Sequence, residues 1–190
     1  AQGNKFYAIK ADGTEKWTFE TCGNVEGFPA VTSDNNVYVV SNGTVATLYS
    51  LNANTGAAKW TKELAGGTGS AVAVDAEGNV YVGTNEGVWS FTADGTQRWS
   101  TSGINVTERG SFAINGNVLY AALKKTDGVA AIDMATGEVK WKTSKGSNDS
   151  YFPTIGPDGT IYYTSKGDKK VYAYNPNGTL KWETEAIAAL

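Results

Sequence analysis

The sequence of 190 residues lacks histidine altogether and contains a single cysteine, Cys22. Without histidine there is no Ser-His-Asp or Cys-His nucleophile system, and no imidazole ligand for a metal. A single cysteine excludes an intrachain disulfide and any cysteine-cluster zinc or iron–sulfur site. We expect Cys22 to be a buried, inert thiol; a reactive thiol and a bridge between two chains are the alternatives.

An excess of charge of one sign and long apolar runs are also missing. The chain has 16 basic and 19 acidic residues, a net charge of −3, which argues against nucleic acid or an anionic membrane surface as a partner. No apolar run approaches the ~20 residues of a membrane span. No signal-peptide pattern is present, and the start at Ala1 rather than Met leads us to expect that an upstream segment was removed.

What the sequence does contain is a repeat marked by tryptophan. Trp17, Trp60, Trp99, Trp141 and Trp182 are separated by 43, 39, 42 and 41 residues. Each closes a phrase that starts with a β-branched or aromatic run, continues with Asp-Gly, Asn-Gly or Thr-Gly, and places a basic residue directly before the tryptophan. Such a phrase is typical of a β-hairpin, because the glycine provides the positive φ that the tight turn needs.

A second hairpin recurs between these phrases. It spans residues 29–40, 71–82, 111–121 and 153–163, with an Asn/Asp/Gly turn and a tyrosine in its second strand. Four short strands in roughly 40 residues are typical of a propeller blade. We therefore predict an all-β fold with little helix: a β-propeller of four-stranded antiparallel blades, with an N-terminal half-blade hairpin (5–20) and four complete repeats at about 28–63, 69–101, 110–143 and 151–184.

The recurring aromatic residues are predicted to pack between neighbouring blades rather than to bind a ligand. They are the five tryptophans of the repeat together with Tyr38, Tyr81, Tyr120 and Tyr162. In a propeller both faces of a blade are covered by its neighbours, so residues at the same place in each repeat meet the same kind of surface.

The phrase Tyr-Ala-Ile-x-Ala-x-(Asx/Thr)-Gly-x-x-x-Trp resembles the PQQ-like repeat, also called the tryptophan-docking motif, over nearly the whole chain. The resemblance implies an extracytoplasmic place: periplasmic, at the cell surface or secreted. Its members include quinoprotein dehydrogenases and an outer-membrane assembly scaffold. The dehydrogenases carry a vicinal cysteine pair, a calcium and an aspartate base. Because Cys22 stands alone, the resemblance implies the fold without the quinone site, and we expect no cofactor and no metal.

The repeat count amounts to four and a half blades in what we predict to be a single domain, residues 1–190. Three arrangements stay open: part of a larger propeller of roughly seven or eight blades, a small propeller whose half-blade another chain completes, or an open array that pairs its edges. An open array exposes strand edges and blade faces, so we expect self-association unless the ring closes.

Candidate functional residues lie in the loops between blades, which vary in residue type while the strands repeat. These loops span 21–28, 64–69, 102–109 and 144–151. We expect the charged and aromatic residues before each first strand to point toward the central channel and to form a rim for a ligand or partner: Glu26, Phe28, Glu108, Arg109, Asp149 and Tyr151. The Asp-Gly turns are predicted to be hairpin turns, because none matches a calcium-binding loop.

Three functions are compatible with these features. The favoured one is a non-catalytic, extracytoplasmic binding or assembly scaffold for a protein or glycan, since no catalytic constellation appears. The alternatives are a fragment or subunit of a quinoprotein-type enzyme, and a self-assembling surface or filament protein.

Overall fold

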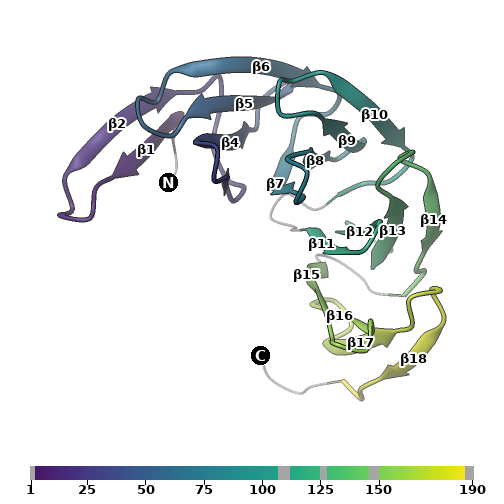
Figure 1. Ribbon diagram of the computed structural model, residues 1–190. Helices are drawn as coiled ribbons and strands as arrows, with labels where there is room; N and C mark the ends of the chain where they lie inside the picture. The colour runs from purple at the N-terminus through teal and green to yellow at the C-terminus, as the bar shows by residue number, and fades with distance from the viewer. Residues whose placement is uncertain (1–2, 107–111, 125–127, 146–149, 187–190) are drawn as a thin grey trace.

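The chain folds into a row of antiparallel β-sheets that stand side by side along an open arc (Figure 1). The computed structural model describes residues 3–106, 112–124, 128–145 and 150–186. Within these ranges all regular structure is strand, as the sequence predicts, and no helix is long and apolar enough to cross a membrane. The N-terminal hairpin and the last sheet stand at the two ends of the arc and do not meet (Figure 1).

The strands form one two-stranded and four four-stranded sheets. The N-terminal hairpin consists of β1 (Lys5–Ile9) and β2 (Glu15–Glu20). The first blade consists of β3 (Ala30–Val31), β4 (Asn36–Ser41), β5 (Ala46–Asn52) and β6 (Ala58–Leu64). The second consists of β7 (Gly69–Val74), β8 (Val80–Thr84), β9 (Gly87–Phe91) and β10 (Gln97–Ser102).

The third blade consists of β11 (Phe112–Asn115), β12 (Val118–Ala122), β13 (Val129–Asp133) and β14 (Val139–Lys142). The fourth consists of β15 (Ser150–Ile155), β16 (Ile161–Ser165), β17 (Lys170–Tyr174) and β18 (Leu180–Glu183). Strands β7, β11 and β15 lie on the inside of the arc, and β6, β10, β14 and β18 lie on the outside (Figure 1). The predicted half-blade and four complete blades are confirmed.

Local chemistry explains the hairpins that carry tryptophan. In the second blade the Asp94 carboxylate accepts the amide of Thr96 at 3.0 Å, and Gly95 adopts φ +87°. This side-chain bond and the positive φ together close the turn. In β10 the register then slips by one residue at Arg98, so that Trp99 lies opposite Ser90 and Gln97 opposite Phe91.

The same bulge precedes the tryptophan in every one of the five hairpins. The bulged residues are Lys16, Lys59, Arg98, Lys140 and Lys181. A bulge re-aims the side chains that follow it. The basic residue of the repeat is therefore the extra residue of the bulge.

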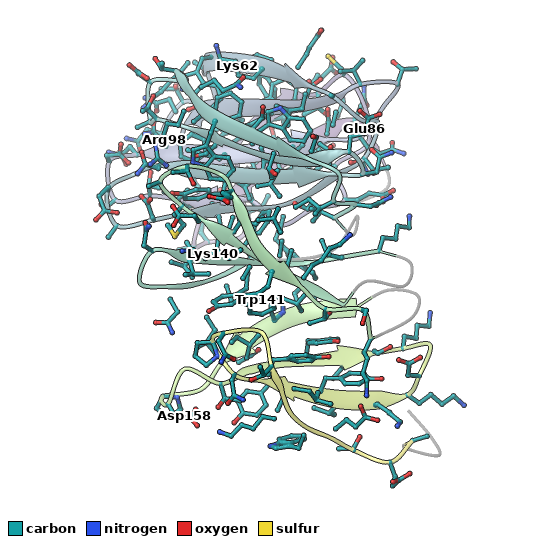
Figure 2. All side chains as sticks on the ribbon, turned by 90° about the vertical axis from the view of Figure 1, so that its right-hand side faces the viewer. Lys62, Glu86, Arg98, Lys140, Trp141 and Asp158 are labelled. Carbon is teal, nitrogen blue, oxygen red and sulfur yellow. The ribbon has the colours of Figure 1, made fainter. Side chains whose placement is uncertain are left out.

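Each of the first four tryptophans of the repeat then docks on the turn of the next blade, whereas Trp182, which was predicted to pack between blades as well, is exposed in the last sheet. A Cβ built on Gly137, which has φ +79°, would stand 2.6 Å from Cε3 of Trp99, so the indole lies where only glycine leaves room. Figure 2 shows Trp141 between the third and fourth blades. In each case the indole Nε1–H donates to a carbonyl of that turn: Trp17 to Ala53 (3.0 Å), Trp60 to Ala93 (2.9 Å), Trp99 to Met134 (2.9 Å) and Trp141 to Pro176 (3.0 Å).

The predicted tyrosines support the tryptophans from within the same blade. The ring pairs are Tyr38–Trp60 (5.7 Å between centroids), Tyr81–Trp99 (5.8 Å), Tyr120–Trp141 (5.8 Å) and Tyr162–Trp182 (5.8 Å). The buried apolar residues divide into four clusters, and each cluster joins two neighbouring sheets. The core is thus a series of junctions rather than one central mass.

The expectation of a buried cysteine is wrong. Cys22 is exposed and free. It follows β2 in a short turn whose backbone is held by two hydrogen bonds. The Thr21 hydroxyl donates to the Gly23 carbonyl at 2.7 Å, and the Tyr49 hydroxyl accepts a bond from the Cys22 amide at 2.9 Å. The turn is anchored through its backbone and leaves Cys22 exposed.

Replacing a docked tryptophan should cost far more stability than replacing the last one of the series. Trp99 is 8% exposed and Trp182 is 42% exposed. We expect Trp99→Ala to lower the free energy of unfolding by about 3–5 kcal/mol, because it empties a junction and removes the indole bond. The matched variant Trp182→Ala should cost less than about 1 kcal/mol. Urea denaturation of dilute protein measures both, and equal losses would contradict the docking role.

Candidate functional site

The predicted rim is only partly within the described residues. Glu108, Arg109 and Asp149 lie outside them. Tyr151 lies within β15 rather than before it, and its backbone is paired with Thr164. Glu26 and Phe28 are exposed and lie together in the segment that leads into β3.

Glu26 and Phe28 line a cleft of about 380 Å³ beside the N-terminal hairpin. One wall of the cleft is β1, through residues 5–7, and the other is the segment 25–29. The Phe28 carbonyl accepts the amide of Val72 at 3.1 Å, which ties this segment to the second blade. The cleft therefore has a firm wall on one side and an edge strand on the other.

The edge of β1 away from β2 has no partner strand within the described residues. β1 pairs with β2 alone, whereas its counterpart in the first blade, β5, pairs on both sides. Across the hairpin the Thr21 amide donates to the Asn4 carbonyl at 2.7 Å. Because antiparallel pairing alternates, the N–H and C=O groups of Lys5 and Tyr7 point to the other edge. The strand that lines one wall of the cleft thus carries main-chain donors and acceptors that are unpaired within the described residues.

An aromatic pair lies on the inside of the arc next to this cleft. The rings of Phe28 and Phe152 are 5.9 Å apart, and both side chains are exposed although the residues belong to opposite ends of the blade series. Phe152 lies in a bulge of β15 with φ +27°, a conformation that bulky residues rarely adopt. The two rings join the entry of the first blade to the inner strand of the fourth.

Phe152 is not among the predicted rim residues, although the sequence carries a signal for it. Phe28 and Phe152 are each followed by proline, Pro29 and Pro153, at the same place in the repeat. The prediction chose Tyr151, the neighbour of Phe152. The recurring Phe-Pro pair is the sequence signal that would have indicated Phe152.

A second cleft, of about 480 Å³, lies between the β3–β4 turn and the β7–β8 turn. It carries Asp34, Asp75 and Glu77. The Asp75 carboxylate accepts the amide of Asn79 at 2.8 Å and the hydroxyl of Tyr81 at 2.8 Å. The Asp34 carboxylate likewise accepts hydrogen bonds from Thr32 and Asn36. Among the described residues no three His, Cys, Asp or Glu side chains form a group that could hold a metal ion.

Hydrogen bonding outweighs burial at Asp75. Burial is the largest single effect and raises the pKa of this carboxyl. The hydrogen bonds from Asn79 and Tyr81 act in the opposite direction and together outweigh burial, so the pKa of Asp75 lies below its ordinary value. Burial, and then the bond to Asp75, raises the pKa of Tyr81 to about 12, although the Arg98 guanidinium beside its hydroxyl opposes this. The network is charged at Asp75 and neutral at Tyr81 near neutral pH.

This network predicts a pH-dependent contribution to stability. A carboxyl whose pKa is lower in the folded state stabilises the fold above its unfolded pKa, about 4, and loses that contribution as the pH falls through the folded value. We expect Asp75→Asn to lower the free energy of unfolding by about 1 kcal/mol at pH 7 and by less below pH 4. Urea denaturation across this pH range measures the difference. The control Glu77→Gln, in the same turn, should change the free energy of unfolding by no more than about 0.5 kcal/mol. A loss of stability for Asp75→Asn that is the same at every pH would contradict the role given to the Asp75 carboxylate.

Comparison with known proteins places this architecture in a family. The family model described as outer membrane protein assembly factor BamB matches residues 3–151. A comparison with curated proteins gave no match. The crystal structure of BamB from Moraxella catarrhalis superimposes with a TM-score of 0.74 at 19% identity, covering 96% of this chain and 56% of that chain.

A quinohemoprotein alcohol dehydrogenase from Comamonas testosteroni superimposes with a TM-score of 0.65 at 17% identity, covering 86% of this chain and 35% of that chain. At such identities these two likenesses show the fold, and the chain spans about half the length of the BamB structure. The match of the family model covers most of the chain. Together with the repeated indole junctions, it shows that the chain belongs to the family described as outer membrane protein assembly factor BamB, with PQQ-type β-propeller repeats.

Proposed function

We propose that this chain is a non-catalytic, extracytoplasmic scaffold whose cleft beside β1 binds an extended segment of a protein partner. The observation that carries the proposal is the unpaired edge of β1 inside a cleft that also presents Phe28. An extended polypeptide adds to such an edge through main-chain bonds and places alternate side chains against the walls. A glycan offers no matching row of N–H and C=O groups, so a protein partner is favoured.

The surroundings of the edge fit an amphipathic strand. Lys5 and Glu26 supply one charge of each sign at the cleft, and Phe6, Tyr7 and Phe28 supply apolar surface. A strand that alternates apolar and polar residues would meet both kinds of group. The family description, outer membrane protein assembly factor, and the alternating strands of outer-membrane barrels are compatible with a partner of this class.

The enzyme alternative has less support. A quinohemoprotein alcohol dehydrogenase shares the fold, but a likeness at 17% identity does not carry an activity to this chain. Four of the five repeated tryptophans are engaged in the junctions between blades, which favours scaffolding as their role.

The proposal predicts binding of extended peptides at β1. A fluorescent ten-residue peptide with alternating apolar and polar residues should bind the chain in anisotropy titrations, and a version with proline at its centre should bind at least about tenfold more weakly. Phe28→Ala should weaken binding of the first peptide by about tenfold or more, because it removes an exposed anchor.

Two further variants sharpen this experiment. Lys5→Pro removes a donor from the free edge without removing a β1–β2 bond and should also weaken binding, whereas Val45→Ala, at an exposed apolar residue outside the cleft, should not. Equal binding of the two peptides, or equal effects of Phe28→Ala and Val45→Ala, would contradict the proposal.

A further inference from the structure

The two ends of the arc carry the two halves of the junction that the chain forms four times internally. Every internal junction combines an indole from one sheet with a glycine turn from the next. At the C-terminal end, Trp182 packs on Tyr162 as the other tryptophans pack on their tyrosines, yet no further turn follows it among the described residues. Its indole is left exposed next to the exposed Leu180.

The N-terminal hairpin carries the matching half. Gly13 has φ +84°, and its amide donates to the Lys10 carbonyl at 3.0 Å, as the Gly95 amide does to Thr92 at 2.9 Å. A Cβ built on Gly95 would meet the indole of Trp60 at 2.9 Å, whereas a Cβ built on Gly13 would meet nothing within 4 Å. The turn has the docking geometry and no indole on it.

The strand next to this turn exposes the residues that an upstream blade would cover. Tyr7 is 47% exposed and Ile9 is 59% exposed, while Phe6 and Ala8 pack against the first blade on the other face of β1. The counterparts of Tyr7 and Ile9 in the first and fourth blades are buried: Tyr49, Leu51, Tyr172 and Tyr174. The N-terminal hairpin thus presents the upstream face of a blade without its neighbour.

We propose that the two end faces bind each other between copies of this chain, with Trp182 of one copy docked on the Gly13 turn of the next and its indole Nε1–H donating to the Ala11 carbonyl. Ala11 holds the place in its turn that Ala93 holds in the turn that receives Trp60. This inference rests on the junction geometry and not on the peptide-binding cleft.

The charged residues at the two end faces are compatible with a second copy as the occupant. At the first junction the Lys16 ammonium donates to the Ala53 carbonyl at 3.0 Å and to the Asn54 side chain at 3.2 Å. The corresponding pair at the two ends is Lys181, which precedes Trp182, and Asp12, which follows Ala11. The second junction already combines the same residue types within the chain, Lys59 before Trp60 and Asp94 after Ala93, so the contact between copies repeats a combination that the fold accepts.

The exposed ion pair that Lys181 makes with Asp158, at 2.9 Å, is a weak competitor for this contact. Because the two faces differ, the contact is head to tail, and it produces a closed ring or a filament according to the rotation between copies.

Two variants that each destroy one half of the junction test the proposal. Trp182→Ala removes the indole, and Gly13→Asn adds a side chain where the indole would lie, with a residue that tolerates positive φ. The control Gly116→Asn changes a glycine in the β11–β12 turn, away from either end face. Gly116 has φ +56°, and a Cβ built on it would meet no atom within 4 Å. Circular dichroism and urea denaturation establish that each variant folds.

The measurement is solution mass by light scattering over a concentration series, with reductant present because Cys22 is exposed. Wild type and Gly116→Asn should associate, and their mass should fall on dilution to the 20.1 kDa of one chain. Trp182→Ala alone and Gly13→Asn alone should associate at least about tenfold more weakly.

An equimolar mixture of Trp182→Ala and Gly13→Asn should form a one-to-one complex, because each contributes the half that the other lacks. The inference is overturned if wild type keeps the mass of one chain, if both variants associate as wild type does, or if the mixture forms no complex. Phe28→Ala should leave the association intact, which separates this outcome from failure of the peptide-binding proposal.

Discussion

The structure depends on one contact, the docking of a tryptophan indole on the glycine turn of the following sheet. Each docked indole fills the space above the turn and satisfies its own N–H on a turn carbonyl. A two-stranded hairpin is marginal by itself, and a single repeat cannot bury its apolar faces alone. The junctions bury the faces that would otherwise be exposed. The bulge before each tryptophan aims the indole at its turn, so backbone irregularity and side-chain packing act together.

The repeated features were predictable and the unrepeated ones were not. Five tryptophans at a near-constant interval, each four residues after a turn glycine, predict the blades, because one physical solution repeats. Cys22 occurs once, and its exposure follows from a local turn that no pattern signals. Phe152 lies in a bulge of β15 and pairs with Phe28 from the other end of the blade series, so this contact depends on tertiary geometry. The basic residue before each tryptophan is visible in the sequence, but only the strand register shows that this residue is the extra residue of a bulge.

The open arc links the proposed function to the proposed self-association. A closed series of blades would bury both the edge of β1 and the faces at the two ends, and these features are what the chain offers to partners (Figure 1). The edge of β1 provides main-chain bonding groups, and the end faces provide an indole and a vacant turn. The two surfaces share Tyr7 and otherwise use different residues, so binding at one surface is separable from binding at the other.

The most direct test of the open series of indole junctions is hydrogen exchange at the indole N–H groups, followed by NMR in dilute solution. The account predicts slow exchange for Trp17, Trp60, Trp99 and Trp141, whose N–H groups are bonded across junctions, and fast exchange for Trp182. Protection of Trp182 in the isolated chain, or rapid exchange at the four docked indoles, would contradict it.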